Sequence, residues 1–172
     1  MARRESTRAV RPTKLIVGEG YAEATLLRHS RALYTSNQQG CRLEIGNARG
    51  KGAAHVVDYS IRFAARAQYD QAAALFDADT DWSDAVAARA RKAGLIVLCS
   101  APCVEAWLLD IVGQARAGGS ADQKARFQQH FGGEAHEEKV FATHLPRPIL
   151  DAARRRVALL DQLLALLEIK TK

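Results

Sequence analysis

The sequence predicts an α/β fold, in which an open, mainly parallel four-stranded sheet is flanked by helices and followed by a helical C-terminal extension. Short apolar runs alternate with amphipathic segments over the first hundred residues, which is typical of strands joined by helices. Runs such as "LIVLC" (95–99) are apolar throughout, as expected for strands that are covered on both faces. Only helical patterns follow Ser100, and they account for the extension.

Strands and helices are expected to alternate strictly up to Ser100. Apolar runs or period-two alternation predict the strands, and apolar residues three or four apart predict the helices. In chain order, the expected elements are strand 14–18, helix 21–34, strand 41–46, helix 53–68, strand 72–76, helix 82–92 and strand 94–99. Asp81 or Ser83 is expected to cap the third of these helices.

The rest of the chain is expected to form helices at 102–113, 120–131, 136–142 and 149–168. The last has apolar residues at a spacing close to 3.5, which predicts a helix that covers the core. A helix that forms a homodimer is the alternative. We divide the chain into a basic flexible arm (1–12), an α/β core (13–113) and a helical extension packed on that core (114–172).

Composition is typical of a water-soluble globular protein. Of the 172 residues, 48% are hydrophobic and 26% are charged, and the formal net charge is +6. This positive charge favours an anionic partner such as nucleic acid. An odd number of cysteines and the absence of an apolar leader indicate a cytoplasmic protein with free thiols. No apolar stretch reaches 18 residues, so we expect no membrane partner.

Charged residues gather where the expected strands end, and open parallel sheets bind ligands there. Asp77 and Asp79 follow the third strand; their side chains point the same way and repel unless a cation lies between them. Mg²⁺ suits such a site, because it takes few carboxylates together with waters and phosphate oxygens. Glu19, between Gly18 and Gly20, is expected to bind the same metal or to act as a general base.

Five further side chains are candidates around this edge or on the basic surface. Glu23, on the first turn of the first helix, either faces the site or only stabilises the helix N-terminus. Arg49 and Lys51 start the second helix, where backbone N–H groups can hold a phosphate; a plain loop is the alternative. Arg154 and Arg155 are expected to contact a nucleic-acid backbone, unless they only line a solvated helix face.

Two stretches resemble the TOPRIM domain of topoisomerases, bacterial-type primases and overcoming-lysogenization-defect nucleases: "IVGEGYAEATLL" (16–27) and "LFDADTD" (75–81). A third, "SAPCVEAWLL" (100–109), resembles the "NPCFExWLL" signature of RloB-like proteins, a TOPRIM-like family linked to bacterial defence. The resemblance implies a TOPRIM or Rossmann-like fold, a nuclease that uses Mg²⁺ or Mn²⁺, and a partner ATPase. It implies that Glu19, Asp77 and Asp79 are catalytic and bind the metal, with Asp81 and Glu105 in support.

The match has departures, and two other functions stay open. Ala101 stands where RloB-like proteins usually have Asn, and Glu23 follows Glu19 by four residues where five is commoner. Nothing resembles the active-site tyrosine region of topoisomerases, which favours the nuclease branch. A non-catalytic module of a multi-component defence system would bind nucleic acid without cleaving it. A phosphatase of the haloacid-dehalogenase type would use Asp77 as nucleophile, although Asp81 stands in the Thr/Val place of that motif and Glu19 would have no role.

Overall fold

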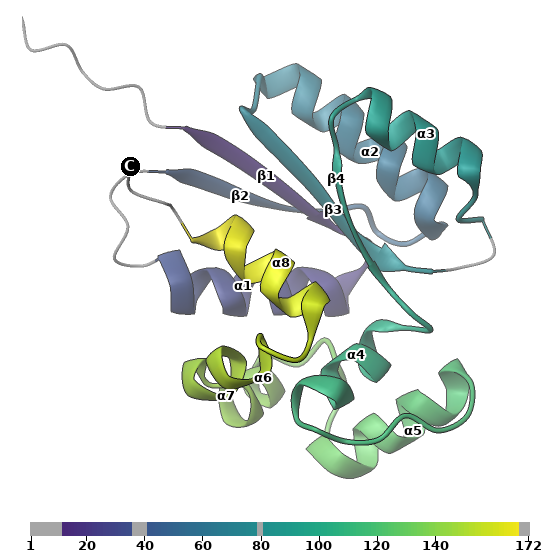
Figure 1. The fold of residues 1–172 in the computed structure, drawn as a ribbon, viewed down its shortest axis with the longest axis vertical. Coiled ribbons are helices and arrows are strands. Elements are labelled where there is room, and N and C mark those ends of the chain that lie inside the picture. Colours follow the sequence, from purple (N-terminus) through teal and green to yellow (C-terminus); the bar gives the residue numbers. More distant parts are fainter. Residues whose placement is uncertain (1–11, 36–40, 79–80, 169–172) are drawn as a thin grey trace, which may run out of the picture.

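A parallel four-stranded sheet forms the centre of the molecule (Figure 1). The computed structural model describes residues 12–35, 41–78 and 81–168. The strands are β1 (Thr13–Gly18), β2 (Arg42–Asn47), β3 (Gln71–Asp77) and β4 (Ile96–Ser100), in the order β2-β1-β3-β4. The predicted fold class is confirmed. The expected basic arm, apart from residue 12, and Asp79 lie outside the described residues.

The strand register brings the carboxyl ends of all four strands to one edge of the sheet. Gly18 at the end of β1 pairs with Asn47 of β2 and with Leu75 of β3. Asp77 at the end of β3 pairs with Ser100 at the end of β4. The loops that leave these strands therefore lie side by side, as the sequence pattern predicted for a parallel sheet.

Helices cover both faces of the sheet because each strand places alternate apolar side chains on opposite faces. The helices α2 (Gly52–Ala67) and α3 (Asp84–Lys92) lie on one face, and α1 (Tyr21–Thr35) lies on the other (Figure 1). Leu15 and Val17 of β1 pack with α2 and α3, whereas Ile16 between them belongs to the apolar cluster on the α1 side. This alternation produces two separate cores.

The C-terminal helices enlarge the core on the α1 side. They are α4 (Val104–Ile111), α5 (Ser120–Phe131), α6 (Glu138–His144), α7 (Arg147–Ala153) and α8 (Ala158–Leu167). Their buried apolar side chains form one cluster with Ile16 and Leu98 of the sheet, so the extension and the α/β core share a hydrophobic core. Within the described ranges, no helix combines the length and the hydropathy that crossing a bilayer requires.

The single helix expected at 149–168 is wrong, because the chain turns between α7 and α8. Val157 has an extended backbone (φ −112°, ψ 90°), which ends the helical hydrogen-bond ladder. Arg156 donates to the carbonyl oxygens of Asp110 and Ile111 at the end of α4, and this contact holds the turn in place. Ile149, expected on the buried face, is 42% exposed. Four leucines of α8, the helix for which a dimer interface was the alternative, are buried inside the chain: Leu160, Leu163, Leu164 and Leu167.

Candidate functional site

The strand order places a topological switch point between β1 and β3. From β1 the chain passes to β2 on one side of it and then to β3 on the other, and α1 and α2 cover opposite faces of the sheet (Figure 1). Open α/β sheets bind ligands beyond the carboxyl ends of the strands at such a point. Glu19 follows β1 directly and Asp77 ends β3, so two of the predicted site residues meet there.

Glu19 is held by both its backbone and its side chain. Its N–H donates to the Leu75 carbonyl (2.9 Å), and its carbonyl accepts from the N–H of Gly50 (2.7 Å). Its carboxylate oxygen Oε2 accepts from the N–H of Asp77 (3.1 Å). These contacts fix the Glu19 side chain across the ends of the two central strands.

Asp77 is oriented by a hydroxyl that sequence analysis did not single out. Ser100, buried at the end of β4, donates its hydroxyl to Asp77 Oδ1 (2.6 Å) and also contacts the Phe76 carbonyl (3.2 Å). The signal that could have identified Ser100 is its position, since it ends a strand next to the one that ends in Asp77. A serine there can hold the carboxylate in one rotamer.

Glu23 combines the two roles that the sequence left open. Its Oε2 accepts from the N–H of Gly20 (2.9 Å). This is a capping contact, in which a Glu in the first turn of a helix binds the backbone N–H of the residue that precedes the helix. The side chain is only 5% exposed. Its pKa is raised to about 7, first by burial and then by the charges of Asp77 and Glu19, while backbone hydrogen bonds oppose the rise. Glu23 therefore caps the helix and also lies within the field of the two strand-end carboxylates.

Gly18 explains how Glu23 comes so close to the sheet. A Cβ atom at this position would lie 2.8 Å from the backbone nitrogen of Ala24 and 2.9 Å from the Cβ of Glu23. Any larger residue would push the first turn of α1 away from the end of β1. The glycine is therefore required for close packing of the helix, and this packing buries Glu23 beside Asp77.

Glu105 reaches the same edge from the first turn of α4. Burial raises the pKa of the Cys103 thiol, and so do a hydrogen bond to Glu105 and the charges of Glu105 and Asp77, so all three side chains are neighbours. Within the described part of the chain, Glu105 Oε2 is buried and has no hydrogen-bond partner. Such an oxygen is costly to bury alone, by about 1–3 kcal/mol. A cation or a donor from a ligand would relieve this cost.

The acidic cluster, which we define as Glu19, Glu23, Asp77 and Glu105, has the chemistry of a site for a hard cation. Mg²⁺ binds through one or two carboxylates and takes its other ligands from waters and phosphate oxygens. Among the described residues no donor reaches Glu105 Oε2, and Glu23 is buried within the field of Asp77 and Glu19, so carboxylates gather here with few donors. Over residues 12–35, 41–78 and 81–168, no three His, Cys, Asp or Glu side chains are placed to hold one ion by themselves.

No protein-family model, curated protein or solved structure matches this chain.

Asp81 has a different role from the one expected. Its two carboxylate oxygens accept from the N–H groups of Ala53 (2.9 Å) and Ala54 (3.1 Å), so it caps α2 from a distant loop. Ser83 caps α3 and accepts from the N–H of Val86 (3.4 Å). Asp81 thus fills the anion position at the start of α2 that the sequence assigned to a phosphate. Gly52 leaves room for it, since a Cβ there would lie 2.6 Å from Asp81 Oδ2.

Arg49 and Lys51 remain available at the site edge despite this capping. The backbone from Arg49 to Gly52 is left-handed throughout, with φ between 63° and 81°, which is costly for the two residues that are not glycine. The N–H of Arg49 donates to Asn47 Oδ1 (2.7 Å) and stabilises this path. Both basic side chains are exposed and have no hydrogen bond or ion pair to any described residue. The loop therefore carries two exposed basic side chains on either side of Gly50, whose N–H binds the Glu19 carbonyl.

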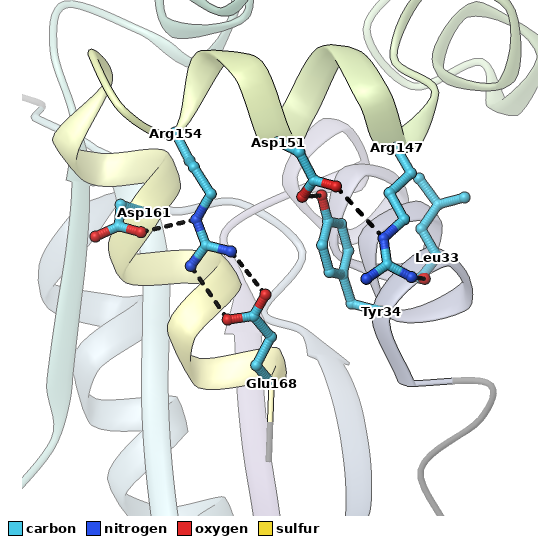
Figure 2. Close-up of polar contacts among 7 residues, drawn as sticks. All are labelled: Leu33, Tyr34, Arg147, Asp151, Arg154, Asp161 and Glu168. Carbon is cyan, nitrogen blue, oxygen red and sulfur yellow. Dashed lines mark hydrogen bonds and ion pairs between the residues drawn. The ribbon is translucent and has the colours of Figure 1, made fainter. Parts of the chain in front are cut away.

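Arg154, expected on a nucleic-acid surface, is taken up by internal ion pairs (Figure 2). Its guanidinium donates to Glu168 through two nitrogens (2.7 and 3.1 Å) and to Asp161 through Nε (2.9 Å). These contacts raise its pKa and leave its charge compensated within the chain. Arg155 is exposed and lines a hollow together with Asp151 and Asp161. The structure thus gives Arg154 a structural role and places Arg155 beside two acidic residues.

Proposed function

We propose that this protein is a Mg²⁺-dependent nuclease that cleaves phosphodiester bonds at the acidic cluster. The observation that carries the proposal is the contact between the two strand ends, where the Glu19 carboxylate accepts from the N–H of Asp77 (3.1 Å). Glu23 is buried beside them, and burial together with the charges of Asp77 and Glu19 raises its pKa. Structural carboxylates are normally placed beside donors or cations, as Arg154 and its partners are. The resemblance of residues 16–27 and 75–81 to the TOPRIM domain supports the same conclusion.

We assign a separate role in catalysis to each residue of the acidic cluster, and to Asp79 and Ser100. Glu19 and Asp77 hold the metal, with Asp79 as a further ligand, and the bound ion supplies charge stabilisation at the phosphate. Ser100 keeps Asp77 in the orientation needed for this task. Glu23, with a pKa of about 7, can accept a proton from an attacking water near neutral pH. Glu105 adds a further oxygen at the same edge.

Substrate binding is assigned to the exposed cations beside the cluster. Arg49 and Lys51 lie on the loop whose Gly50 N–H binds the Glu19 carbonyl, so their position is linked to that of the metal ligand. We expect them to bind backbone phosphates, with an affinity that falls as salt concentration rises. The net charge of +6 favours the same partner.

The proposed biological setting is bacterial defence in the cytoplasm, together with an ATPase partner. Its support is the resemblance of "SAPCVEAWLL" to RloB-like proteins. The free thiols of Cys41 and Cys103 suit a reducing compartment.

Cleavage assays test the proposal directly. Purified protein is incubated with end-labelled single- and double-stranded DNA and RNA, with Mg²⁺, Mn²⁺ or EDTA. We expect metal-dependent cleavage that Glu19→Gln and Asp77→Asn each reduce by about 100-fold or more. Asp84→Asn is the matched control, because Asp84 is exposed on α3 and belongs to no part of the cluster. Equal cleavage by all four proteins would contradict the proposed site.

A second candidate function is a non-catalytic module that binds nucleic acid. The observation in its favour is that the described residues do not include three side chains placed to hold one ion. This function predicts salt-sensitive binding that is weakened by Arg49→Gln and Lys51→Gln, with no cleavage under any metal condition. The same set of substrates therefore separates the two functions.

A further inference from the structure

A pocket of about 580 Å³ opens beside Ser100, at the end of β4. Its walls come from the end of β4, from α4, from the segment that follows α4 and from the turn between α7 and α8. This volume lies within the range of about 300–1,000 Å³ that is common for small-molecule sites. None of its lining residues except Ser100 contributes to the proposed nuclease site.

Two arginines enter this pocket, and Asp110 holds both of them. Arg116 donates through Nε to both carboxylate oxygens of Asp110 (3.0 and 2.8 Å) and through Nη1 to the carbonyl of Ala101 (2.5 Å). Arg156 donates to the backbone carbonyls of Asp110 and of Ile111 at the end of α4. Both guanidinium groups are therefore positioned before any ligand arrives, which lowers the entropic cost of binding.

The charge at this place is positive, and hydrogen-bond donors remain. Two guanidinium groups and one carboxylate, that of Asp110, line the pocket, and this carboxylate pairs with Arg116. A guanidinium carries five N–H donors, which is more than Arg116 or Arg156 uses in its contacts with the described residues. Planar, fixed guanidinium groups match the oxygens of a phosphate group. The polar part of the pocket thus suits a phosphate ester.

Most of the remaining wall is apolar. Val157 lines it from the turn before α8, Leu159 from the first turn of α8, and Ala115 from the segment that follows α4. Trp107 also contributes to the wall and is almost completely buried. A pocket with a few fixed polar groups and an apolar wall is the usual arrangement for a ligand that has a charged end and an organic body.

We propose that this pocket binds a phosphate-bearing ligand of mononucleotide size, with its phosphate at Arg116 and Arg156 and its organic part against Val157 and Leu159. Ser100 connects the pocket to the nuclease site, because it lines the pocket and donates its hydroxyl to Asp77. A bound ligand therefore contacts the residue that orients a metal ligand. The phosphate belongs either to a free mononucleotide or to a nucleic-acid strand, and the experiment below separates these sources.

Isothermal titration calorimetry in EDTA tests the pocket without any contribution from a metal. The titrants are adenosine and uridine monophosphate, inorganic phosphate and a short single-stranded oligonucleotide. We expect a mononucleotide to bind more tightly than inorganic phosphate. Arg116→Gln and Arg156→Gln should each weaken this binding at least tenfold, while Glu19→Gln leaves it unchanged. Binding would then stand even if the nuclease proposal fails.

The controls separate loss of the site from loss of the fold. Arg62→Gln removes one exposed arginine from α2, outside the pocket, and should bind like the wild type. Ala115→Trp keeps both guanidinium groups and fills the pocket from an exposed position, so it should abolish binding. Circular dichroism checks that each variant is folded. Weakening by Arg156→Gln that is seen only with the oligonucleotide would support a strand phosphate as the source. Binding that is absent, or equal in all variants, would overturn the proposal.

Discussion

Two groups of charged side chains in this protein differ in how their charge is balanced. Between α7 and α8, Arg154 donates to the carboxylates of Asp161 and Glu168, and the interaction is complete within the chain (Figure 2). At the carboxyl ends of β1 and β3, by contrast, Glu23 is buried next to Asp77 and Glu19, and its pKa is raised by burial first and then by these like charges. In the first group, the positive charge of Arg154 is neutralised by carboxylates of the same chain. In the second group, carboxylates lie beside other carboxylates.

This difference separates a structural role from a functional one. Along the same helices, Tyr34 donates to Asp151 (2.7 Å), and Arg147 pairs with that carboxylate (3.5 Å) and lies over the Tyr34 ring (Figure 2). These contacts join α1 to α7 and need nothing from outside. Burying several carboxylates together is unfavourable for folding, so its presence at a switch point indicates a site that is completed by a ligand.

The largest expected effect comes from neutralising Glu23. Its pKa in the folded protein, about 7, lies above the ordinary value of 4.5, so the folded state binds the proton more tightly. The resulting stabilisation is full below pH 4.5 and is lost as pH rises through 7. Without divalent metal, Glu23→Gln should therefore be more stable than wild type at pH 8 by up to about 3 kcal/mol, and equal to it near pH 4.5.

Urea unfolding at a series of pH values measures this difference. Glu138→Gln is the control, because Glu138 is an exposed carboxylate on the first turn of α6. Mg²⁺ should stabilise the wild type more at pH 8 than at pH 6, since the ion and the proton compete for the same region. If the difference in the free energy of unfolding between the wild type and Glu23→Gln did not change with pH, Glu23 would not have a raised pKa. The acidic cluster would then not differ in this way from the ion pairs of Arg154.

Removing the cap of α2 should have an intermediate effect. Asp81→Ala leaves the N–H groups of Ala53 and Ala54 without their acceptors, and Lys51 at the start of α2 provides no side-chain cap. We expect a loss of about 1–2 kcal/mol in the free energy of unfolding. Asp81→Asn keeps an acceptor oxygen and should lose less. If Asp81→Ala instead removed metal binding and left stability intact, Asp81 would belong to the acidic cluster.

The smallest effect on stability is expected from the ion pairs of Arg154. Arg154 and Glu168 have side chains that are 23% and 34% exposed, so solvent weakens their attraction. A double-mutant cycle with Arg154→Met and Glu168→Gln should give a coupling energy of about 1 kcal/mol that decreases in high salt. Neither variant should change metal-dependent stabilisation. A coupling that is insensitive to salt would argue for packing, and not charge, as the basis of this contact.

The order of strands and helices up to Ser100 was predictable because local apolar periods determine it. The positions of Glu19 and Asp77 could be predicted from these strands, because parallel strands bring their carboxyl ends to one edge of the sheet. The Gly20 and Glu23 spacing also carried a capping signal that is visible in the sequence. These features depend only on residues near one another in the chain or on the sheet edge.

The features that could not be predicted depend on tertiary contacts. Asp81 caps a helix that starts almost thirty residues earlier, and no local pattern indicates this partner. The apolar period of 149–168 continues through the turn at Val157, so periodicity alone could not reveal the break between α7 and α8. The same turn brings Arg154 within hydrogen-bond distance of Glu168. Because the sequence pattern does not reveal the turn, it could not reveal that Arg154 forms an ion pair within the chain.

The central strand pair ends in two amide protons that are held in different ways. The N–H of Glu19 donates to a backbone carbonyl, that of Leu75, and its protection against hydrogen exchange depends on the pairing of β1 with β3. The N–H of Asp77 donates to a carboxylate, that of Glu19, and its protection depends also on where that side chain points. Exchange at residue 19 therefore follows the opening of the sheet, while exchange at residue 77 also follows the position of the Glu19 side chain.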